Sequence, residues 1–127
     1  YYINFDISFV KLAFLMGCGT AGGDCTYKKI QFNTAVDDSI GNYFTQKGAN
    51  TVIGFYNLVY PSKPLFVDFA KKFWNEMARG KTVGNVVKDI RRKYPKITGV
   101  YEQDKFIPRP HVFGDESTKI IPAAYGK

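Results

Sequence analysis

The chain has 127 residues, the length of one domain, and its 45% hydrophobic residues, including 11 Phe and 9 Tyr, favour a packed core over disorder. Its 18 basic and 11 acidic residues give a net charge of +7, but no nucleic-acid-binding module surrounds the scattered basic residues. Two Cys and one His are too few for a disulfide framework or a four-ligand zinc site, and residues 12–18, the longest apolar run, are too few to span a membrane. No cofactor is expected.

The first predicted elements are strands. Residues 10–17 are nearly continuously apolar, which is typical of a parallel-sheet strand that is covered on both faces. Residues 3–9 alternate between apolar and polar and indicate an edge or lead-in strand. Residues 19–35 have no clear periodicity and predict a polar, glycine-bearing loop.

A short helix and a second strand follow. Asp37 or Asp38 can cap a helix through residues 40–44, and Gly48 ends it. Residues 50–59 are rich in β-branched and aromatic side chains and predict a buried strand.

The next segment predicts two helices. Ser62 caps the first, Pro64 lies in its first turn and Gly80 ends it. Its broad apolar face, which we assign to the core, consists of Leu65, Phe66, Phe69, Ala70, Phe73, Trp74 and Met77. Thr82 opens the second helix and Pro95 ends it. The apolar face of the second helix consists of Val83, Val86, Val87, Ile90 and Tyr94.

The last part of the chain predicts an irregular connection over residues 96–110, then a strand, a turn and a strand over residues 111–115 and 118–121. The order of strand, helix, strand, two helices and short strand is an α/β pattern with a parallel or mixed sheet covered by helices. We expect residues 1–127 to form a single domain or a part of one.

The stretch FLMGCGTAGGD, residues 14–24, follows the first strand and allows three interpretations: a dinucleotide-binding turn, a nucleophile, or an ordinary turn. Gly17, Gly19 and Gly22 have the dinucleotide-binding spacing, but that fingerprint needs a helix to begin inside the motif, and no helical periodicity follows. Asp24 would also put a negative charge where the phosphates of a dinucleotide bind. A P-loop is excluded because no Gly-Lys-Ser/Thr is present. The nucleophile interpretation is therefore preferred.

Cys18 is the candidate nucleophile, because a side chain at the carboxyl end of a central strand faces the crevice where open α/β sheets bind ligands. Gly17 and Gly19 allow a substrate backbone to approach and leave the local amides free to stabilise an oxyanion. A thiol needs a neighbouring base to raise its reactivity at neutral pH. Tyr56 and Asn57 end the second strand on the same side and are candidates to line a substrate pocket.

Four blocks of the sequence, LAFLMGCGTAG, IGNYFTQKGANTVIGFYNLV, FWNEMARGKTVGNVVKDIRRKY and VFGDESTKI, resemble caspase-like cysteine peptidases in their order and spacing. The likeness covers residues 9–121 and is closest to the gingipain-type family, with likeness to CHAT domains as well. It implies the carboxyl-terminal portion of a caspase-like three-layer α/β sandwich with a mostly parallel sheet. It also implies a cysteine endopeptidase with a peptide or protein substrate, in which Cys18 is the nucleophile and its own amide contributes to the oxyanion hole.

The chain departs from this family in two respects: no His precedes Cys18, whereas the family's base lies on an earlier strand, and the strand that family members carry before the Cys strand is missing too. The resemblance implies that the base comes from a segment upstream of Tyr1, and the absence of an initial Met favours a processed product or part of a larger protein. The alternative is a catalytically inactive scaffold or interaction domain. The one histidine, His111, comes at the wrong place in the family's order.

Two further residues bear on the site and its setting. Asp24 would suit a basic residue before the scissile bond, or it is a loop carboxylate that fixes a turn. Cys25 is treated as a bystander that could form a disulfide with Cys18 under oxidising conditions. A gingipain-type protein would be secreted or at the cell surface, and other members of the group would be cytoplasmic. No nucleic-acid partner and no membrane span are expected.

Overall fold

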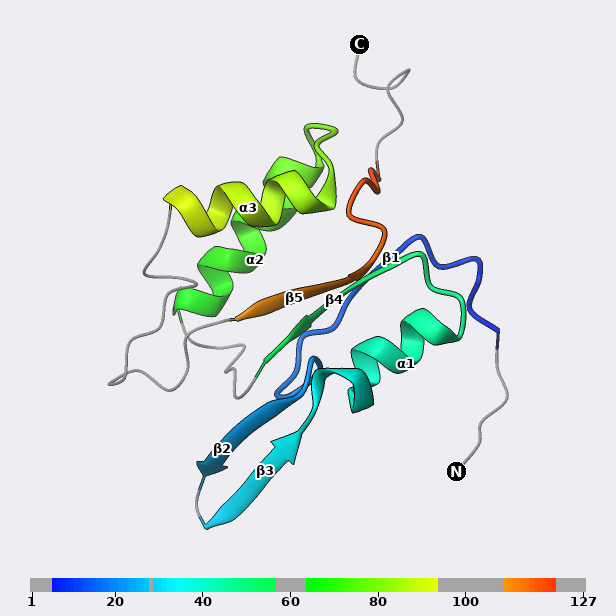
Figure 1. Cartoon of the computed structure of the whole chain (residues 1–127). Helices are drawn as coiled ribbons and strands as arrows, with labels where there is room; N and C mark the ends of the chain where they lie inside the picture. Colours follow the sequence, from blue (N-terminus) through cyan, green and yellow to red (C-terminus); the bar gives the residue numbers. More distant parts are fainter. Residues whose placement is uncertain (1–5, 28, 57–63, 94–108, 121–127) are drawn as a thin grey trace.

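A three-stranded sheet lies at the centre of the chain in the computed structural model, which describes residues 6–27, 29–56, 64–93 and 109–120 (Figure 1). Its strand order is β1-β4-β5. β1 (Leu12–Phe14) pairs in parallel with β4 (Thr51–Phe55), and β4 pairs in antiparallel with β5 (Pro110–Gly114). The sheet is therefore mixed, with one parallel and one antiparallel pairing. The predicted order of elements allowed either a parallel or a mixed sheet.

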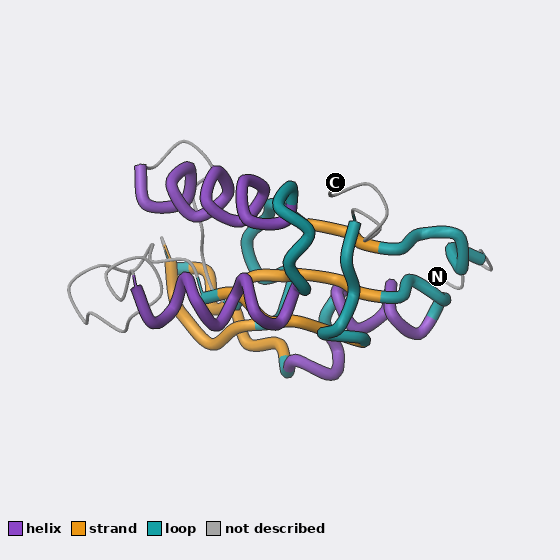
Figure 2. Tube along the Cα trace, turned by 90° about the horizontal axis from the view of Figure 1, so that it is seen from above, coloured by secondary structure: helices purple, strands orange, loops and turns teal. Residues whose placement is uncertain are grey.

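Helices cover both faces of this sheet. α1 (Ile40–Gln46) lies on one face, and α2 (Pro64–Met77) and α3 (Val83–Lys93) lie side by side on the other (Figures 1 and 2). Successive side chains of β4 point to opposite faces, so that Ile53 packs toward α2 and α3 while Val52 packs toward α1. All five residues of β4 are buried as a result, and the chain is an α/β protein.

The larger of the two apolar cores contains a cluster of phenylalanines that joins the sheet to α2. Phe55, Phe69 and Phe73 are fully buried in it, and Phe14 of β1 packs against them. The ring centroids of Phe14 and Phe55 are 5.5 Å apart, and those of Phe14 and Phe73 are 5.1 Å apart. The core assignment of Trp74 was wrong: its ring touches Phe73, but the residue is 41% exposed at the margin of the α2 stripe.

The predicted loop over residues 19–35 was wrong for most of its length. β2 (Gly23–Tyr27) and β3 (Ile30–Thr34) form an antiparallel hairpin that extends away from the sheet (Figure 1). Its turn includes Lys29 with a φ of 65°, a left-handed conformation that lysine adopts without any glycine signal in the sequence.

The first strand is shorter and less buried than predicted. Only residues 12–14 form β1, and they are half-buried because β1 lies at an edge of the described sheet. Residues 6–9 form no strand, so the lead-in strand was wrong there, and residues 3–5 lie outside the described part. The Ile7 N–H instead donates to the Lys47 carbonyl at 3.1 Å.

Helix α1 is capped by Ser39 rather than by either aspartate. The Ser39 hydroxyl accepts from the Asn42 N–H at 3.3 Å, and Asp37 and Asp38 belong to the short 3-10 helix η1 (Val36–Asp38) that precedes it. Gly48, with a φ of 113°, follows the end of α1 as predicted.

The later helices agree with the prediction, whereas the carboxyl-terminal strands agree in part. Thr82 caps α3 through its hydroxyl, which accepts from the Asn85 N–H at 3.3 Å. β5 begins at Pro110, one residue earlier than expected, and residues 118–120 form no strand. The predictions that lie outside the described residues are those on residues 57–59 of the second strand, on Ser62, Tyr94 and Pro95, on residues 96–108 of the irregular connection and on Ile121, and the burial of Leu65 is not described either. No helix among the described segments has the length and apolar character to cross a bilayer.

Candidate active site

Cys18 lies in the turn that directly follows β1, where the carboxyl ends of β1 and β4 meet. The Leu15 N–H donates to the Ile53 carbonyl at 2.8 Å, which extends the parallel pairing by one residue before the chain turns. The Cys18 side chain is exposed, and the disulfide with Cys25 is not formed in this structure. A nucleophile in this position is accessible to a substrate at the end of the sheet where α/β proteins bind ligands.

The Thr20 hydroxyl fixes this turn to the central strand. It accepts from the Phe55 N–H at 2.8 Å, and the Leu15 and Gly17 carbonyls each lie 3.2 Å from it as acceptors. The hydroxyl therefore bridges β1 and β4 at the point where their own pairing ends. The Ala21 N–H continues this attachment by donating to the Phe55 carbonyl at 3.0 Å.

The backbone of the turn lies directly on β4, and a glycine makes this contact possible. A Cβ on Gly54 would lie 3.0 Å from the Thr20 carbonyl carbon and oxygen, closer than packed side chains come to backbone atoms. The Gly41 N–H, in the first turn of α1, donates to the Thr20 carbonyl at 2.8 Å. The turn that carries Cys18 is thus held, through Thr20, by contacts with both the sheet and α1.

The two glycines beside Cys18 shape the turn. Gly19 has a φ of 65°, a left-handed conformation that glycine adopts without strain, and its carbonyl accepts from the Gly22 N–H at 2.9 Å. The Gly17 N–H donates to the Leu15 carbonyl at 3.0 Å. Within the described segments, the Gly19 N–H donates no hydrogen bond, so it can serve as a donor to a substrate oxygen.

Two of the remaining predicted site residues, Tyr56 and Asp24, lie in different parts of the fold. Tyr56 directly follows Phe55, which binds the turn, and it is half-buried, so it lies at the same end of the sheet. Asp24 is exposed on β2, in the hairpin that leaves the sheet. Asn57 lies outside the described residues. The structure therefore brings Tyr56 to the Cys18 end of the sheet and places Asp24 on a separate element.

His111 lies closer to this turn than its place in the sequence suggested. It pairs with Gly54 across β4 and β5, and its ring packs at a tilt against Phe113 with centroids 4.5 Å apart. Phe113 belongs to the core under α1, on the face of the sheet that carries the Thr20 backbone, so His111 and the Cys18 turn share one face and one end of the sheet. Partial burial, and next to it the charge of Arg91, lower the pKa of His111, whereas Glu116 and Asp37 oppose the shift.

Sequence reasoning missed Thr20 and the proximity of His111. A threonine among glycines carries no recognisable signal, because its function depends on Phe55, 35 residues later in the chain. The position of His111 depends on the antiparallel register of β5 on β4. The glycine inside the second strand, Gly54, was a usable signal, since a glycine within a strand often marks a close backbone approach.

A cavity of about 710 Å³ lies elsewhere, between α3 and β5, and Cys18 does not line it. The described residues contain no group of three His, Cys, Asp or Glu side chains that could hold a metal ion. Comparison of the chain with protein-family models, with curated proteins and with solved structures gives no match.

Proposed function

We propose that the chain is the carboxyl-terminal part of a caspase-like cysteine endopeptidase domain, with Cys18 as its nucleophile. The observation that supports this most is the Cys18 turn, an exposed thiol at the carboxyl end of a parallel strand, fixed to the central strand by Thr20. Helices on both faces of the sheet agree with the sandwich that the resemblance implies. A rigid attachment matters because a nucleophile that is held in the attack geometry reacts without a further loss of freedom.

The proposed reaction proceeds through a thioester. The Cys18 sulfur attacks the carbonyl carbon of the scissile bond, and the carbonyl oxygen gains negative charge in the tetrahedral intermediate. The Gly19 N–H and, by the family resemblance, the Cys18 N–H donate to this oxygen. The carbon–nitrogen bond then breaks, a proton passes from the base to the leaving amine, and water hydrolyses the thioester to an acid and the free thiol.

The proposed reaction also needs a base, and the 127 residues contain no histidine before Cys18, where the family has its base. By the resemblance, it is a histidine upstream of Tyr1 that removes the thiol proton. His111 is the alternative within the chain, because it shares a face and an end of the sheet with the Cys18 turn. Tyr56 and Asn57 are the proposed substrate contacts, and Asp24 would favour a basic residue before the scissile bond.

The test is the alkylation rate of Cys18 by iodoacetamide in a Cys25→Ser background, where Cys18 is the one thiol left in the 127 residues. We expect the folded natural protein, with any upstream segment, to react faster than the same protein in urea, because a base activates the thiol only in the folded state. Replacing His111 by Gln identifies the base: an unchanged rate supports an upstream histidine, and a loss of the difference supports His111. Hydrolysis of a peptide substrate, abolished by Cys18→Ser, would establish the peptidase itself.

The alternative is a catalytically inactive scaffold of the same fold, and one observation favours it: no histidine precedes Cys18 in the 127 residues. Equal alkylation rates for the folded and the urea-unfolded protein, together with no peptide hydrolysis, would support this alternative and contradict the peptidase.

A further inference from the structure

Helix α3 lies along β5 and is tied to the β5 segment at both ends. At the amino end of the helix, the Val83 N–H donates to the Thr118 carbonyl at 2.9 Å and the Gly84 N–H to the Glu116 carbonyl at 2.8 Å. Near its carboxyl end, the Arg91 guanidinium donates to the Pro110 carbonyl. Between these two attachments the helix and the strand are separated by the cavity of about 710 Å³. We call this space the α3–β5 groove.

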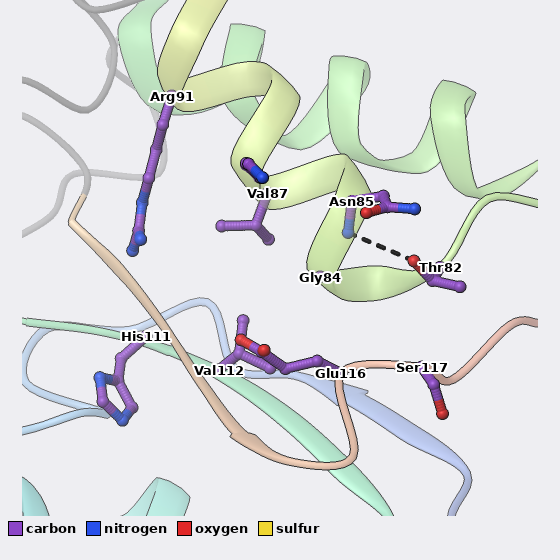
Figure 3. A pocket seen from close by; sticks show the side chains of 10 residues that line it. Thr82, Gly84, Asn85, Val87, Arg91, His111, Val112, Glu116 and Ser117 are labelled. Atoms are coloured by element: carbon purple, nitrogen blue, oxygen red, sulfur yellow. Dashed lines mark hydrogen bonds between the residues drawn. The ribbon is translucent and has the colours of Figure 1, made fainter.

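The groove lies between the side of α3 that carries Gly84, Val87 and Arg91 and the outer edge of β5. Figure 3 shows Arg91 and Val87 above it, Val112 and Glu116 below it, and the His111 ring turned away from it. Because β5 is the last strand in the order β1-β4-β5, this edge has no partner strand among the described residues. Cys18 does not line the groove, which is therefore separate from the candidate active site.

The hydrogen-bond register shows which backbone groups of β5 face the groove. The Tyr56 N–H donates to the Arg109 carbonyl at 2.9 Å, and the Asp115 N–H donates to the Asn50 carbonyl at 3.0 Å. In an antiparallel ladder alternate residues bond to the same neighbour, so residues 111 and 113 also bond to β4. The N–H and carbonyl of Val112 then point outward. The bond from Arg91 to the Pro110 carbonyl agrees with this direction, because Pro110 precedes Val112 by two residues.

Basic side chains at the groove have no carboxylate partner among the residues described. Lys81 and Arg92, elsewhere on this helical segment, form ion pairs with Glu76 or Asp89. Lys88 and Arg91 line the groove and form no ion pair within the described part of the chain. Glu116 is the one acidic residue in the lining, so the groove keeps an excess of positive charge.

We propose that the α3–β5 groove binds an extended acidic segment of a partner protein as an added strand on β5. The segment pairs its backbone with the outward N–H and carbonyl of Val112, and its carboxylates lie near Lys88 and Arg91. Strand addition to an open sheet edge is a general mode of peptide recognition, in which the backbone contributes affinity and the side chains contribute specificity. The unpaired edge of β5 allows backbone pairing, and the basic side chains of the groove favour an acidic segment.

The test uses a short fluorescein-labelled peptide in which valine and glutamate alternate, with binding followed by fluorescence anisotropy. The same peptide with methylated backbone amides keeps its charges but cannot donate strand hydrogen bonds. We expect the methylated peptide to bind about tenfold more weakly. We expect Lys88→Glu to weaken binding of the unmodified peptide about five- to tenfold, as for a partly exposed charge pair that is reversed.

Two variants serve as controls. Lys71→Glu makes the same charge change at an exposed position of α2, outside the groove, and should leave binding unchanged. Cys18→Ser should also leave binding unchanged, so that failure of the proposed peptidase activity and failure of this site are distinguishable. Equal binding of the methylated peptide, or an equal loss with Lys71→Glu, would overturn the proposal in favour of diffuse attraction to the +7 chain. A dimer in sedimentation that excludes the peptide would overturn it in favour of a second copy on β5.

Discussion

At the scale of single residues, Thr20 has the clearest expected effect, because its hydroxyl links two strands and the turn that carries Cys18. We predict that Thr20→Val lowers the free energy of unfolding by about 1–3 kcal/mol, since the N–H of the buried residue Phe55 loses its acceptor while the side-chain volume is kept. The alkylation rate of Cys18 should move toward that of the unfolded protein, because the turn loses its attachment to β4. Urea unfolding and iodoacetamide kinetics measure the two effects.

The matched control for this change is Thr45→Val in α1. The Thr45 hydroxyl donates to the Gly41 carbonyl at 3.1 Å, a bond back to the preceding helical turn that adds little stability. A second variant, Thr20→Ser, keeps the hydroxyl and should preserve the Cys18 alkylation rate. Equal effects of Thr20→Val and Thr45→Val on that rate would show that the Thr20 hydroxyl does not hold the turn.

His111 should make the stability of the protein depend on pH near neutrality. Its pKa is lowered in the folded state by partial burial and by Arg91, so the unfolded chain takes up the proton first as the pH falls. The free energy of unfolding is therefore expected to decrease as the pH falls below about 6.5, and to level off below the folded-state pKa. The decrease should be small, because His111 is only partly buried and its interactions are screened by solvent.

Urea unfolding over a series of pH values measures this effect, with His111→Gln as the comparison. Carboxyl groups titrate at lower pH, and the chain has no second histidine, so the variant should lose the slope in this window. An unchanged slope in His111→Gln would mean that the imidazole is not responsible.

At the scale of elements, the sequence predicted what hydrophobic periodicity encodes. The spacing of four between Phe69, Phe73 and Met77 predicts α2 because the helical repeat places these side chains on one face, where all three are buried. β4 was predicted for a similar reason, since its β-branched and aromatic run suits a strand that is covered on both sides.

The sequence did not predict the features that depend on backbone conformation or on contacts between residues far apart in the chain. The β2–β3 hairpin has a turn at Lys29, whose positive φ no local residue preference announces. The location of the Cys18 turn followed from its glycines and the preceding apolar run, but the Thr20 attachment and the nearness of His111 depend on the pairing of β4 with its neighbours. A candidate nucleophile was therefore predictable from the sequence, whereas the residues that position it were not.

At the scale of the whole molecule, the aromatic core should make the described elements unfold together. Phe69 of α2 is fully buried and its ring lies 5.5 Å from that of Phe55 in β4 and 6.3 Å from that of Phe14 in β1. One side chain thus contacts two strands of the sheet from the helix that covers them. Because Phe14 precedes the Cys18 turn in the chain and the Phe55 backbone binds that turn, the stability of this core bears on the candidate site.

We predict that Phe69→Ala lowers the free energy of unfolding by about 3–5 kcal/mol, through lost burial and the cavity that remains. This is a large share of the roughly 5–15 kcal/mol that stabilises an ordinary domain, so urea unfolding should shift strongly while remaining a single transition. Phe9→Ala removes the same atoms at a position that is 83% exposed, and it should change stability by no more than about 0.5 kcal/mol. If far-ultraviolet circular dichroism and Cys18 alkylation gave separate transitions for Phe69→Ala, the turn and the aromatic core would not belong to one cooperative unit.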